Sequence, residues 1–478
     1  MSDMVRTRAA ISPTGFPHIG TIYQVLFDYA FAKKHQGRFI VRIEDTDQER
    51  TVAGAETKIF SALDWFGLSE DESIRKKGPY GPYRQSDRLP IYKKYAEELV
   101  GKGKAYYCFC TKQRLEELRN QLQKQKKVPM YDKYCRKLNS EEVKKRLQTG
   151  EKFVIRLKVP ENITIKVRDE LRGEISFDSD NVDDQVLLKS DGYPTYFLAV
   201  VVDDHLMKIT HMVRGEEWLT SSPKIKLLYD HFQWDIPRLY HTPIIRNPDK
   251  SKFSKRQGHT NVDWYKKNGF LPEAILNYLA LLGWSHPEGK ELFTLTEFIA
   301  LFDLKDLKPI GPIFDLPKLE WMNGQYIMKM QRSKIKDQIL NYYKKYQDLR
   351  LPEDMVEKTV PLIQERIKKL ADYLPLCEFF FQPPEKYEIN LSSQKELFSK
   401  IVEKLQQISD WQAEELGGAM QSLASDLKVK NSEFFMALRV AVSGKKITPP
   451  LNESMEILGK TECLRRIELT IDKTANNC

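Results

Sequence analysis

The chain begins with an alternation of apolar and polar positions that predicts a strand, a helix and a second strand. The short apolar run from Val5 to Ile11 is typical of a buried strand, whereas Ile22 to Lys34 carries apolar residues three and four positions apart, as an amphipathic helix does. A second short apolar run extends from Arg38 to Ile43. A strand, helix and strand at this spacing predict a βαβ unit, in which the two strands are parallel.

The middle of the chain changes character twice. A second helix is expected from Ala53 to Phe66, and the turn-rich stretch from Gly78 to Pro90 marks a boundary. From Ile91 to about Val182, basic helical segments alternate with strand-like runs, which predicts an α/β insertion. The parallel sheet is expected to resume with Asp183 to His205 and again with His211 to Trp218, because these apolar runs also end in polar groups.

The last third of the chain, from about Leu271, shows helical patterns and no convincing strand. The expected helices are PEAILNYLALLGW, SKIKDQILNYYKKYQ, VEKTVPLIQERIKKLADYL, SQKELFSKIVEKLQQI, NSEFFMALRVAVSG and SMEILGKTECLRRIEL. The sequence therefore predicts an α/β, Rossmann-like domain with a parallel sheet, split by an α/β insertion and followed by an all-α C-terminal region. The expected divisions are the two halves of the Rossmann domain at 1–85 and 186–248, the insertion at 86–185, a connecting domain at 249–322, and two helical domains at 323–372 and 373–478.

Composition narrows the class of protein. The 478 residues are 41% hydrophobic, which is enough for several cores, and no apolar run approaches the roughly 20 residues that a membrane span needs. The first residues lack the hydrophobic segment of a signal peptide, so we expect a cytoplasmic protein without a membrane partner. Six cysteines are too few for a disulfide framework in so long a chain. An excess of nine cations over anions suits a polyanionic partner without requiring one.

The first candidate site is the turn SPTGFPHIGT, from Ser12 to Thr21, which joins the first strand to the first helix. Free backbone N–H groups and the helix dipole converge at such a turn, so it suits an anion the size of a phosphate. Ser12 and Glu44 each follow one of the two parallel strands, and we expect them at the same edge of the sheet. Taken alone, His18 would fit better as an uninvolved histidine at an ordinary capped helix start.

A second motif changes that interpretation. The run NPDKSKFSKRQGH, from Asn247 to His259, sets several cations among serines and a glycine. A basic loop of this type is what an enzyme needs to neutralise a leaving pyrophosphate. Its cations are Lys250, Lys252, Lys255, Arg256 and, when protonated, His259.

The two motifs together resemble the paired signatures of class I aminoacyl-tRNA synthetases, which are of the His-Ile-Gly-His and Lys-Met-Ser-Lys-Ser types. Thr21 stands at the second histidine of the first signature, a variant that the glutamate-specific branch accepts, and Phe253 replaces the methionine of the second. Within this class the chain is similar, essentially from end to end, to bacterial-type glutamyl-tRNA synthetases. The segments that carry this similarity are RTRAAISPTGFPHIGT, RFIVRIEDTD, GPYRQSDR, SDGYPTYFLAVVVDDH, RGEEW, NPDKSKFSKR and the helical tail.

The resemblance implies a glutamate–tRNA ligase. Such an enzyme activates L-glutamate with ATP, accompanied by Mg²⁺, and transfers the glutamyl group from glutamyl-adenylate to the 2′-hydroxyl of the terminal adenosine of tRNA(Glu). The glutamate-binding positions of the family match Arg8, Ser12, Glu44, Tyr196 and Arg214, with Glu44 against the substrate ammonium. The ATP-binding positions match Gly15, His18, Gly20, Lys252, Ser254, Lys255 and Arg256, of which His18, Lys252 and Lys255 are expected to be catalytic.

Three cysteines in the insertion are candidate metal ligands. Cys108, Cys110 and Cys135 fall within 28 residues, and thiolates are the soft ligands that a tetrahedral zinc prefers. Some members of the resembled family fill the fourth position with a tyrosine at the spacing of Tyr131, which implies a structural Zn²⁺. The alternative is three reduced cysteines in an ordinary helical hairpin.

The resemblance also places the tRNA. It implies that the insertion lies near the acceptor end of the tRNA, residues 249–322 near its stem and the helical tail near the anticodon, with Arg366 against the third anticodon base. It further implies a monomer that activates glutamate only when tRNA is bound. Two alternatives stay open, namely an enzyme that also charges tRNA(Gln) and a catalytically silent tRNA-binding paralogue. Glutaminyl-tRNA synthetases have a β-barrel anticodon region, against which the helical tail argues.

Overall fold

The strand, helix and strand expected at the start of the chain are present. β1 (Arg6–Ile11) and β2 (Arg38–Ile43) pair in parallel, with Arg6 opposite Arg38 and Ile11 opposite Ile43. Between them runs α1 (Ile19–Lys34), which begins three residues before the expected start because His18 caps it. The carboxyl ends of both strands therefore lie at one edge, as the βαβ pattern predicts.

The computed structural model describes residues 4–251, 253 and 260–475, and the chain divides into two compact units. The first unit combines Met1–Val262 with Leu276–Asp315, and the second combines Asp263–Ile275 with Leu316–Cys478. α8 (Val262–Lys267) and α9 (Pro272–Gly283) belong partly to each unit. Within the described residues, no helix is both long enough and apolar enough to span a membrane.

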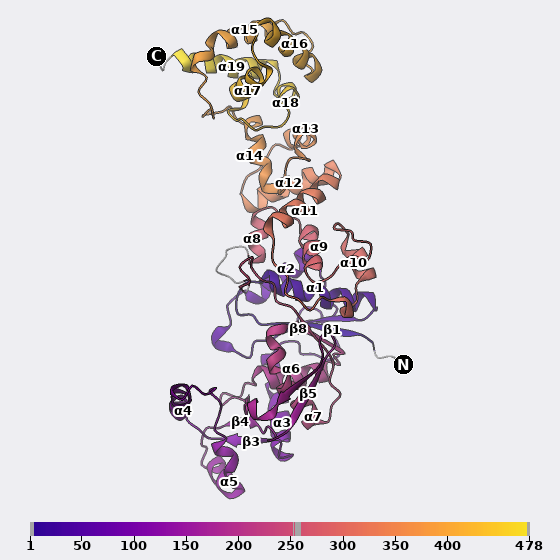
Figure 1. Ribbon diagram of the computed structural model, residues 1–478, viewed down its shortest axis with the longest axis vertical. Coiled ribbons are helices and arrows are strands. Elements are labelled where there is room, and N and C mark those ends of the chain that lie inside the picture. The colour runs from indigo at the N-terminus through magenta and orange to yellow at the C-terminus, as the bar shows by residue number, and fades with distance from the viewer. Residues whose placement is uncertain (1–3, 252, 254–259, 476–478) are drawn as a thin grey trace. The chain divides into compact units, whose positions relative to one another are not determined.

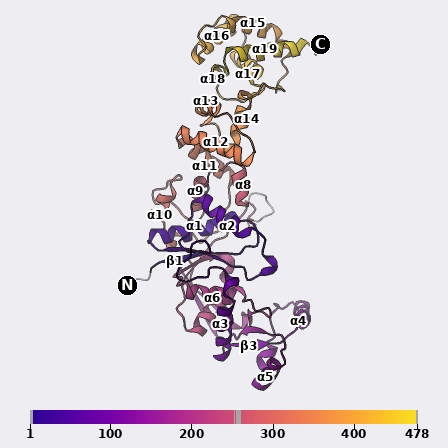
Figure 2. The same ribbon diagram turned by 180° about the vertical axis from the view of Figure 1, so that it is seen from behind.

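All strands among the described residues lie in the first unit. Figures 1 and 2 show the chain from two opposite directions. β8 pairs in parallel with β9, and β1 runs beside β8, since Thr210 N donates to Arg6 O at 3.0 Å. β5 joins β9 in parallel and forms an antiparallel hairpin with β6, while β3, β4 and β7 form a separate antiparallel sheet. The bounds are β3 (Ala105–Cys108), β4 (Val154–Leu157), β5 (Thr164–Asp169), β6 (Gly173–Asp178), β7 (Val186–Leu188), β8 (His211–Gly215) and β9 (Arg238–Thr242).

The helices of the first unit pack around these sheets, and both views show α4 and α5 at the same end of the unit as β3. Their bounds are α2 (Ala55–Phe66), α3 (Leu89–Gly101), α4 (Lys112–Lys124), α5 (Ser140–Gln148), α6 (Tyr196–Leu206), α7 (Ser222–Phe232) and α10 (Leu295–Leu301). The α/β class with a parallel sheet split by an α/β insertion is confirmed, because β3, β4 and β7 lie in the chain between β2 and β8.

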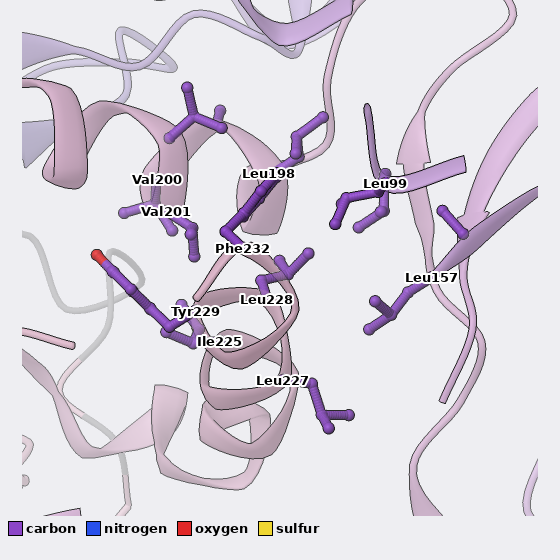
Figure 3. Close-up of a cluster of buried hydrophobic side chains, with 14 of the residues drawn as sticks. Leu99, Leu157, Leu198, Val200, Val201, Ile225, Leu227, Leu228, Tyr229 and Phe232 are labelled. Carbon is purple, nitrogen blue, oxygen red and sulfur yellow. The ribbon is translucent and has the colours of Figure 1, made fainter. Parts of the chain in front are cut away.

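The main apolar core of the first unit ties the insertion to the parallel sheet. Figure 3 shows Leu198 and Val201 of α6 close to Leu228 of α7, with Leu99 of α3 and Leu157 of β4 approaching from the side. All these side chains are buried, and each contributes about 1.5–3 kcal/mol relative to an exposed position. This core fixes α6 and α7, whose first turns border the candidate site.

The expectation that the parallel sheet resumes within Asp183 to His205 is wrong. β7 pairs with β4 in the antiparallel sheet, and the longer apolar run is α6. Every residue from Leu198 to Asp204 is buried, so this helix has no exposed face in that stretch, and its apolar run resembles a buried strand in sequence. The parallel sheet resumes only with β8, within the expected His211 to Trp218.

The second unit is helical in the part that the structure describes, as expected. Two predicted helices are each broken in two. VEKTVPLIQERIKKLADYL forms α13 and α14, with Pro361 in the last turn of α13, and SMEILGKTECLRRIEL is divided at Gly459, whose φ of +81° ends α18. The bounds are α11 (Leu316–Lys329), α12 (Arg332–Tyr346), α13 (Glu353–Ile363), α14 (Tyr373–Cys377), α15 (Lys395–Gln406), α16 (Ala413–Asp426), α17 (Asn431–Ser443), α18 (Leu451–Leu458) and α19 (Lys460–Ala475).

Candidate active site

Two neighbouring cavities lie at the carboxyl ends of β1 and β2. One has a volume of about 430 Å³ and the other about 870 Å³. Both are lined by Ser12 and Thr14 from the turn after β1, and by Thr21 and Gln24 from α1. The turn from Ser12 to Thr21 therefore separates two spaces that one substrate pair could fill together.

The smaller cavity contains His18, which caps α1 with its own side chain. The Nδ1 atom of His18 accepts a hydrogen bond from Gly20 N at 2.9 Å. Because Nδ1 is the acceptor, a neutral His18 carries its proton on Nε2. A Cβ atom at Gly20 would lie only 3.0 Å from Nδ1, so a residue without a side chain suits this close approach. The arrangement combines an imidazole N–H with a helix N-terminus, which is a setting for a phosphate group.

Gly15 and Gly20 also line the smaller cavity, as expected for the ATP-binding positions. Phe253 is buried, and its ring lies 6.0 Å from that of His18 and stacks on Phe314 at 4.6 Å. It therefore keeps the apolar character of its position in the second signature. The other residues predicted from that signature, Lys252, Ser254, Lys255 and Arg256, lie outside the described residues.

The larger cavity brings together the whole predicted glutamate set. Its lining includes Arg8, Ser12, Glu44, Tyr196 and Arg214, which come from β1, the ends of β1 and β2, the start of α6, and β8. The ring of Tyr196 stacks on Trp218 with centroids 4.3 Å apart, so this wall of the cavity is aromatic.

A buried network of charges supports one side of this cavity. Asp204 accepts from Arg42 at 2.6 Å and from Arg8 at 3.3 Å, and Arg42 also donates to Glu44 at 2.8 Å. Burial alone would raise the pKa of Asp204, but the two arginines outweigh it, so its pKa lies below the usual value. Burial raises the pKa of Glu44 above its usual value, because Arg42 and its other partners offset only part of the desolvation.

The two predicted glutamate-binding arginines differ in how their donors are used. All three side-chain nitrogens of Arg8 donate to protein acceptors, to Asp204 and to the carbonyl of Val213. In Arg214, Nε and Nη2 have partners, whereas its buried Nη1 has no hydrogen-bond partner among the described residues. An orphaned buried donor is costly unless a ligand satisfies it, so Arg214 is the stronger candidate for a carboxylate.

Sequence reasoning missed several residues of this network. Arg42, Asp204 and Asp28 were not singled out, although each interrupts an apolar run, in RFIVRI, VVVDDH and VLFDYA respectively. A charge inside a segment otherwise suited to a core is the signal that could have identified them. Asp28 lines the larger cavity, and burial raises its pKa well above the usual value.

The four predicted metal ligands of the insertion are brought together. The sulfur atoms of Cys108, Cys110 and Cys135 lie within 4.8 Å of one another, and Tyr131 Oη is 3.4 Å from the first sulfur and 3.3 Å from the second. Zn–S bonds of about 2.3 Å separate the thiolates of a tetrahedral site by about 3.8 Å, so the cluster fits zinc. Cys108 and Cys135 are hydrogen-bonded to each other, which lowers the pKa of the Cys108 thiol and raises that of the Cys135 thiol.

Arg366 lies in the second unit, in the turn that follows α13, and its side chain is exposed. It is close enough to Arg439 of α17 for its charge to lower the pKa of that guanidinium, to which burial contributes more. Two cations near one another at a surface suit an anionic partner.

Comparison with known proteins bears on the whole chain. Residues 4–321 match the family described as tRNA synthetases class I (E and Q), catalytic domain, and residues 333–471 match the family described as anticodon binding domain. The glutamate–tRNA ligase of Thermus thermophilus is 45% identical over 97% of this chain and 99% of its own length. That of Acidothermus cellulolyticus is 42% identical over 97% of this chain and 94% of its own length.

A solved structure shows the same similarity in three dimensions. A crystal structure of a glutamate tRNA ligase from Elizabethkingia meningosepticum, in complex with its amino acid, superposes with a TM-score of 0.89. It is 35% identical in sequence, and the match covers 98% of this chain and 99% of that one.

Proposed function

Because this chain belongs to the glutamate- and glutamine-specific class I tRNA synthetases, we propose that its two neighbouring cavities hold ATP and glutamate side by side. The chain is a glutamate–tRNA ligase, an ATP-dependent enzyme. The observation that carries the assignment of the site is the shared wall from Ser12 to Thr21, with His18 in one cavity and Arg214 in the other.

Glutamate would occupy the larger cavity. Its side-chain carboxylate matches the orphaned Nη1 of Arg214, since a guanidinium offers only donors and a carboxylate only acceptors. Its ammonium group matches Glu44, and Tyr196 with Trp218 would cover the aliphatic part. Arg8 completes the pocket from β1, and Ser12, which lines both cavities, lies where the two cavities meet.

Activation would take place between the cavities. The α-carboxylate oxygen of glutamate attacks the α-phosphorus of ATP, the bond to the β-phosphate breaks, and pyrophosphate leaves. The Nε2–H of His18 and the N-terminus of α1 are suited to the charge on the phosphates, as Lys252 and Lys255 would be from the second signature. Mg²⁺ bound to ATP supplies further charge neutralisation. The residues stabilise charge and form no covalent bond to the substrate.

Transfer of the glutamyl group to the tRNA would follow in the same cavity. The 2′-hydroxyl of the terminal adenosine attacks the carbonyl carbon of glutamyl-adenylate, AMP leaves, and the hydroxyl proton is lost. The tRNA acceptor end would approach over the insertion, and the anticodon would contact the helical region that contains Arg366. In the insertion, Cys108, Cys110, Tyr131 and Cys135 would hold a structural zinc that fixes the segment around β3 and α4.

Charging of purified tRNA(Glu) and tRNA(Gln) with labelled glutamate tests this proposal. We expect ATP-dependent charging of tRNA(Glu), and charging of both tRNAs would identify a non-discriminating enzyme. Replacement of Arg214 by glutamine should raise the KM for glutamate about ten- to a hundredfold, because a charged hydrogen bond to the substrate carboxylate is lost. An unchanged KM in this variant would refute the assignment of the larger cavity, and no charging of either tRNA would favour the silent paralogue.

A further inference from the structure

The guanidinium of Arg214 is held in one orientation by two neighbours. Its Nε atom donates to His241 Nε2 at 2.9 Å, and its Nη2 atom donates to Ser222 Oγ at 3.0 Å. Arg214 and His241 are register partners on the neighbouring parallel strands β8 and β9, so their side chains leave the sheet on the same face. Ser222 is the first residue of α7. Among the described residues, Nη1 is the one side-chain nitrogen of Arg214 without a hydrogen-bond partner, and Arg214 lines the larger cavity.

His241 can accept this hydrogen bond in only one form. A guanidinium in a protein does not lose its proton, so His241 Nε2 must be unprotonated and the imidazole proton must sit on Nδ1. Asp169, at the end of β5, accepts a hydrogen bond from this Nδ1–H, with its Oδ2 atom 2.7 Å from Nδ1. Asp169 is in turn anchored, because its carboxylate accepts from the backbone N–H groups of Leu171, Arg172 and His241.

The hydroxyl of Ser222 is also oriented as an acceptor for Arg214. It accepts from Arg214, and its own proton is directed to Trp218 O at 3.4 Å or to His241 Nε2 at 3.3 Å. Asp169, His241 and Ser222 are each 0% exposed to solvent. The aspartate, histidine and serine have the order of a nucleophilic triad, but the serine is enclosed and faces an arginine, so the group is suited to positioning.

We propose that Asp169, His241 and Ser222 are positioning residues that aim Nη1 of Arg214 at the side-chain carboxylate of glutamate. The proposal rests on the assignment of the larger cavity to glutamate. Its physical basis is preorganisation, since a guanidinium already fixed by two acceptors loses little freedom when the substrate binds. Burial, together with the charges of Arg214 and Arg172, lowers the pKa of His241 although Asp169 raises it, which favours the neutral imidazole that accepts from Arg214.

The test compares the KM for glutamate with the KM for ATP and the melting temperature in five variants. His241→Leu removes the acceptor for Nε and should raise the glutamate KM about ten- to a hundredfold with the ATP KM unchanged within about twofold. Ser222→Ala should raise the glutamate KM about three- to tenfold. His241→Gln keeps an acceptor that can reach Arg214 and should restore the glutamate KM to within about threefold of the unsubstituted chain.

His211→Leu is the matched control, because it removes another buried imidazole from the neighbouring strand, β8, where the ring hydrogen-bonds to the hydroxyl of Thr210. It should lower the melting temperature as His241→Leu does while leaving the glutamate KM unchanged. If Arg214→Gln raises the glutamate KM but neither His241→Leu nor Ser222→Ala does, the positioning role is refuted and the glutamate site stands. If Arg214→Gln has no effect, the glutamate site itself is refuted. Should His241→Leu fail to fold, an unchanged glutamate KM in Ser222→Ala overturns the proposal.

Discussion

Replacement of Asp204 by asparagine should destabilise the first unit far more than the same substitution at Asp64. Both carboxylates form short ion pairs with arginine, at 2.6 Å to Arg42 for Asp204 and at 2.8 Å to Arg75 for Asp64. The difference lies in their surroundings, since the Asp204 side chain is 0% exposed and that of Asp64 is 56% exposed. Asp204 also faces Arg8, so its loss leaves two arginines without their shared counter-ion.

The magnitude follows from burial. An uncompensated buried charge costs about 3–5 kcal/mol, whereas an exposed pair contributes about 0–1 kcal/mol. At roughly 2–4 °C per kcal/mol for a domain of this size, Asp204→Asn should lower the melting temperature by roughly 6–20 °C, and Asp64→Asn by less than about 4 °C. Differential scanning calorimetry measures both transitions. Equal shifts for the two variants would show that the buried network does not stabilise the fold as described.

The same carboxylate gives a pH dependence with a definite sign. The pKa of Asp204 is lowered in the folded state, so its stabilising contribution is complete above the unfolded pKa of about 3.9 and is lost as pH falls through the lower folded pKa. The difference in melting temperature between the unsubstituted chain and Asp204→Asn should therefore stay constant from pH 5 to 8. A difference that already shrinks between pH 7 and 5 would contradict the direction of this shift.

Three further predictions concern the other predicted residues. Because burial raises the pKa of Glu44, kcat/KM for glutamate should fall on the acid side at a pH above 4.5. Glu44→Gln should lower the plateau of kcat/KM and abolish this decrease at low pH. If the decrease persists in the variant, a group other than Glu44 causes it. Elemental analysis should find one zinc per chain, lost in Cys135→Ser but kept in Cys377→Ser, which alters a buried cysteine of the second unit; a metal-free chain purified without chelator would end the zinc hypothesis. Arg366→Gln should reduce the preference for tRNA(Glu) over tRNA(Gln) roughly tenfold in charging assays, and unchanged selectivity would remove Arg366 from recognition.

Local patterns in the sequence carried much of the fold. The strand, turn and helix around Ser12 to Thr21 depend on neighbouring residues, and the spacing of Cys108, Cys110 and Cys135 is also local, so both could be predicted. Long-range packing decided the rest. α6 is buried almost all round and has no periodic signature, and the single positive φ at Gly459 divides a helix that propensity alone would continue.

The site shows the same division between local and long-range information. Arg8 and Arg214 were found through a resemblance, because a strand-borne arginine has no chemistry of its own that distinguishes a ligand from a surface charge, whereas the βαβ pattern alone placed Glu44 at the edge of the sheet. The partners that hold them, such as Asp204 and His241, come from elements 27 to 196 residues away, and pairings at that separation cannot be read from one sequence. A charged residue within an apolar run is the local signal in the sequence that could have identified Asp204.

We propose that the turn after β1 divides an ATP site from a glutamate site, with His18 on the ATP side. The most direct measurement is tRNA-dependent pyrophosphate exchange in the unsubstituted chain and in His18→Ala, at varied glutamate concentration. In His18→Ala we expect adenylate formation to fall about a hundredfold or more, because one donor to the developing phosphate charge is lost, while the KM for glutamate stays within about twofold. Equal losses in rate and in glutamate affinity would contradict it.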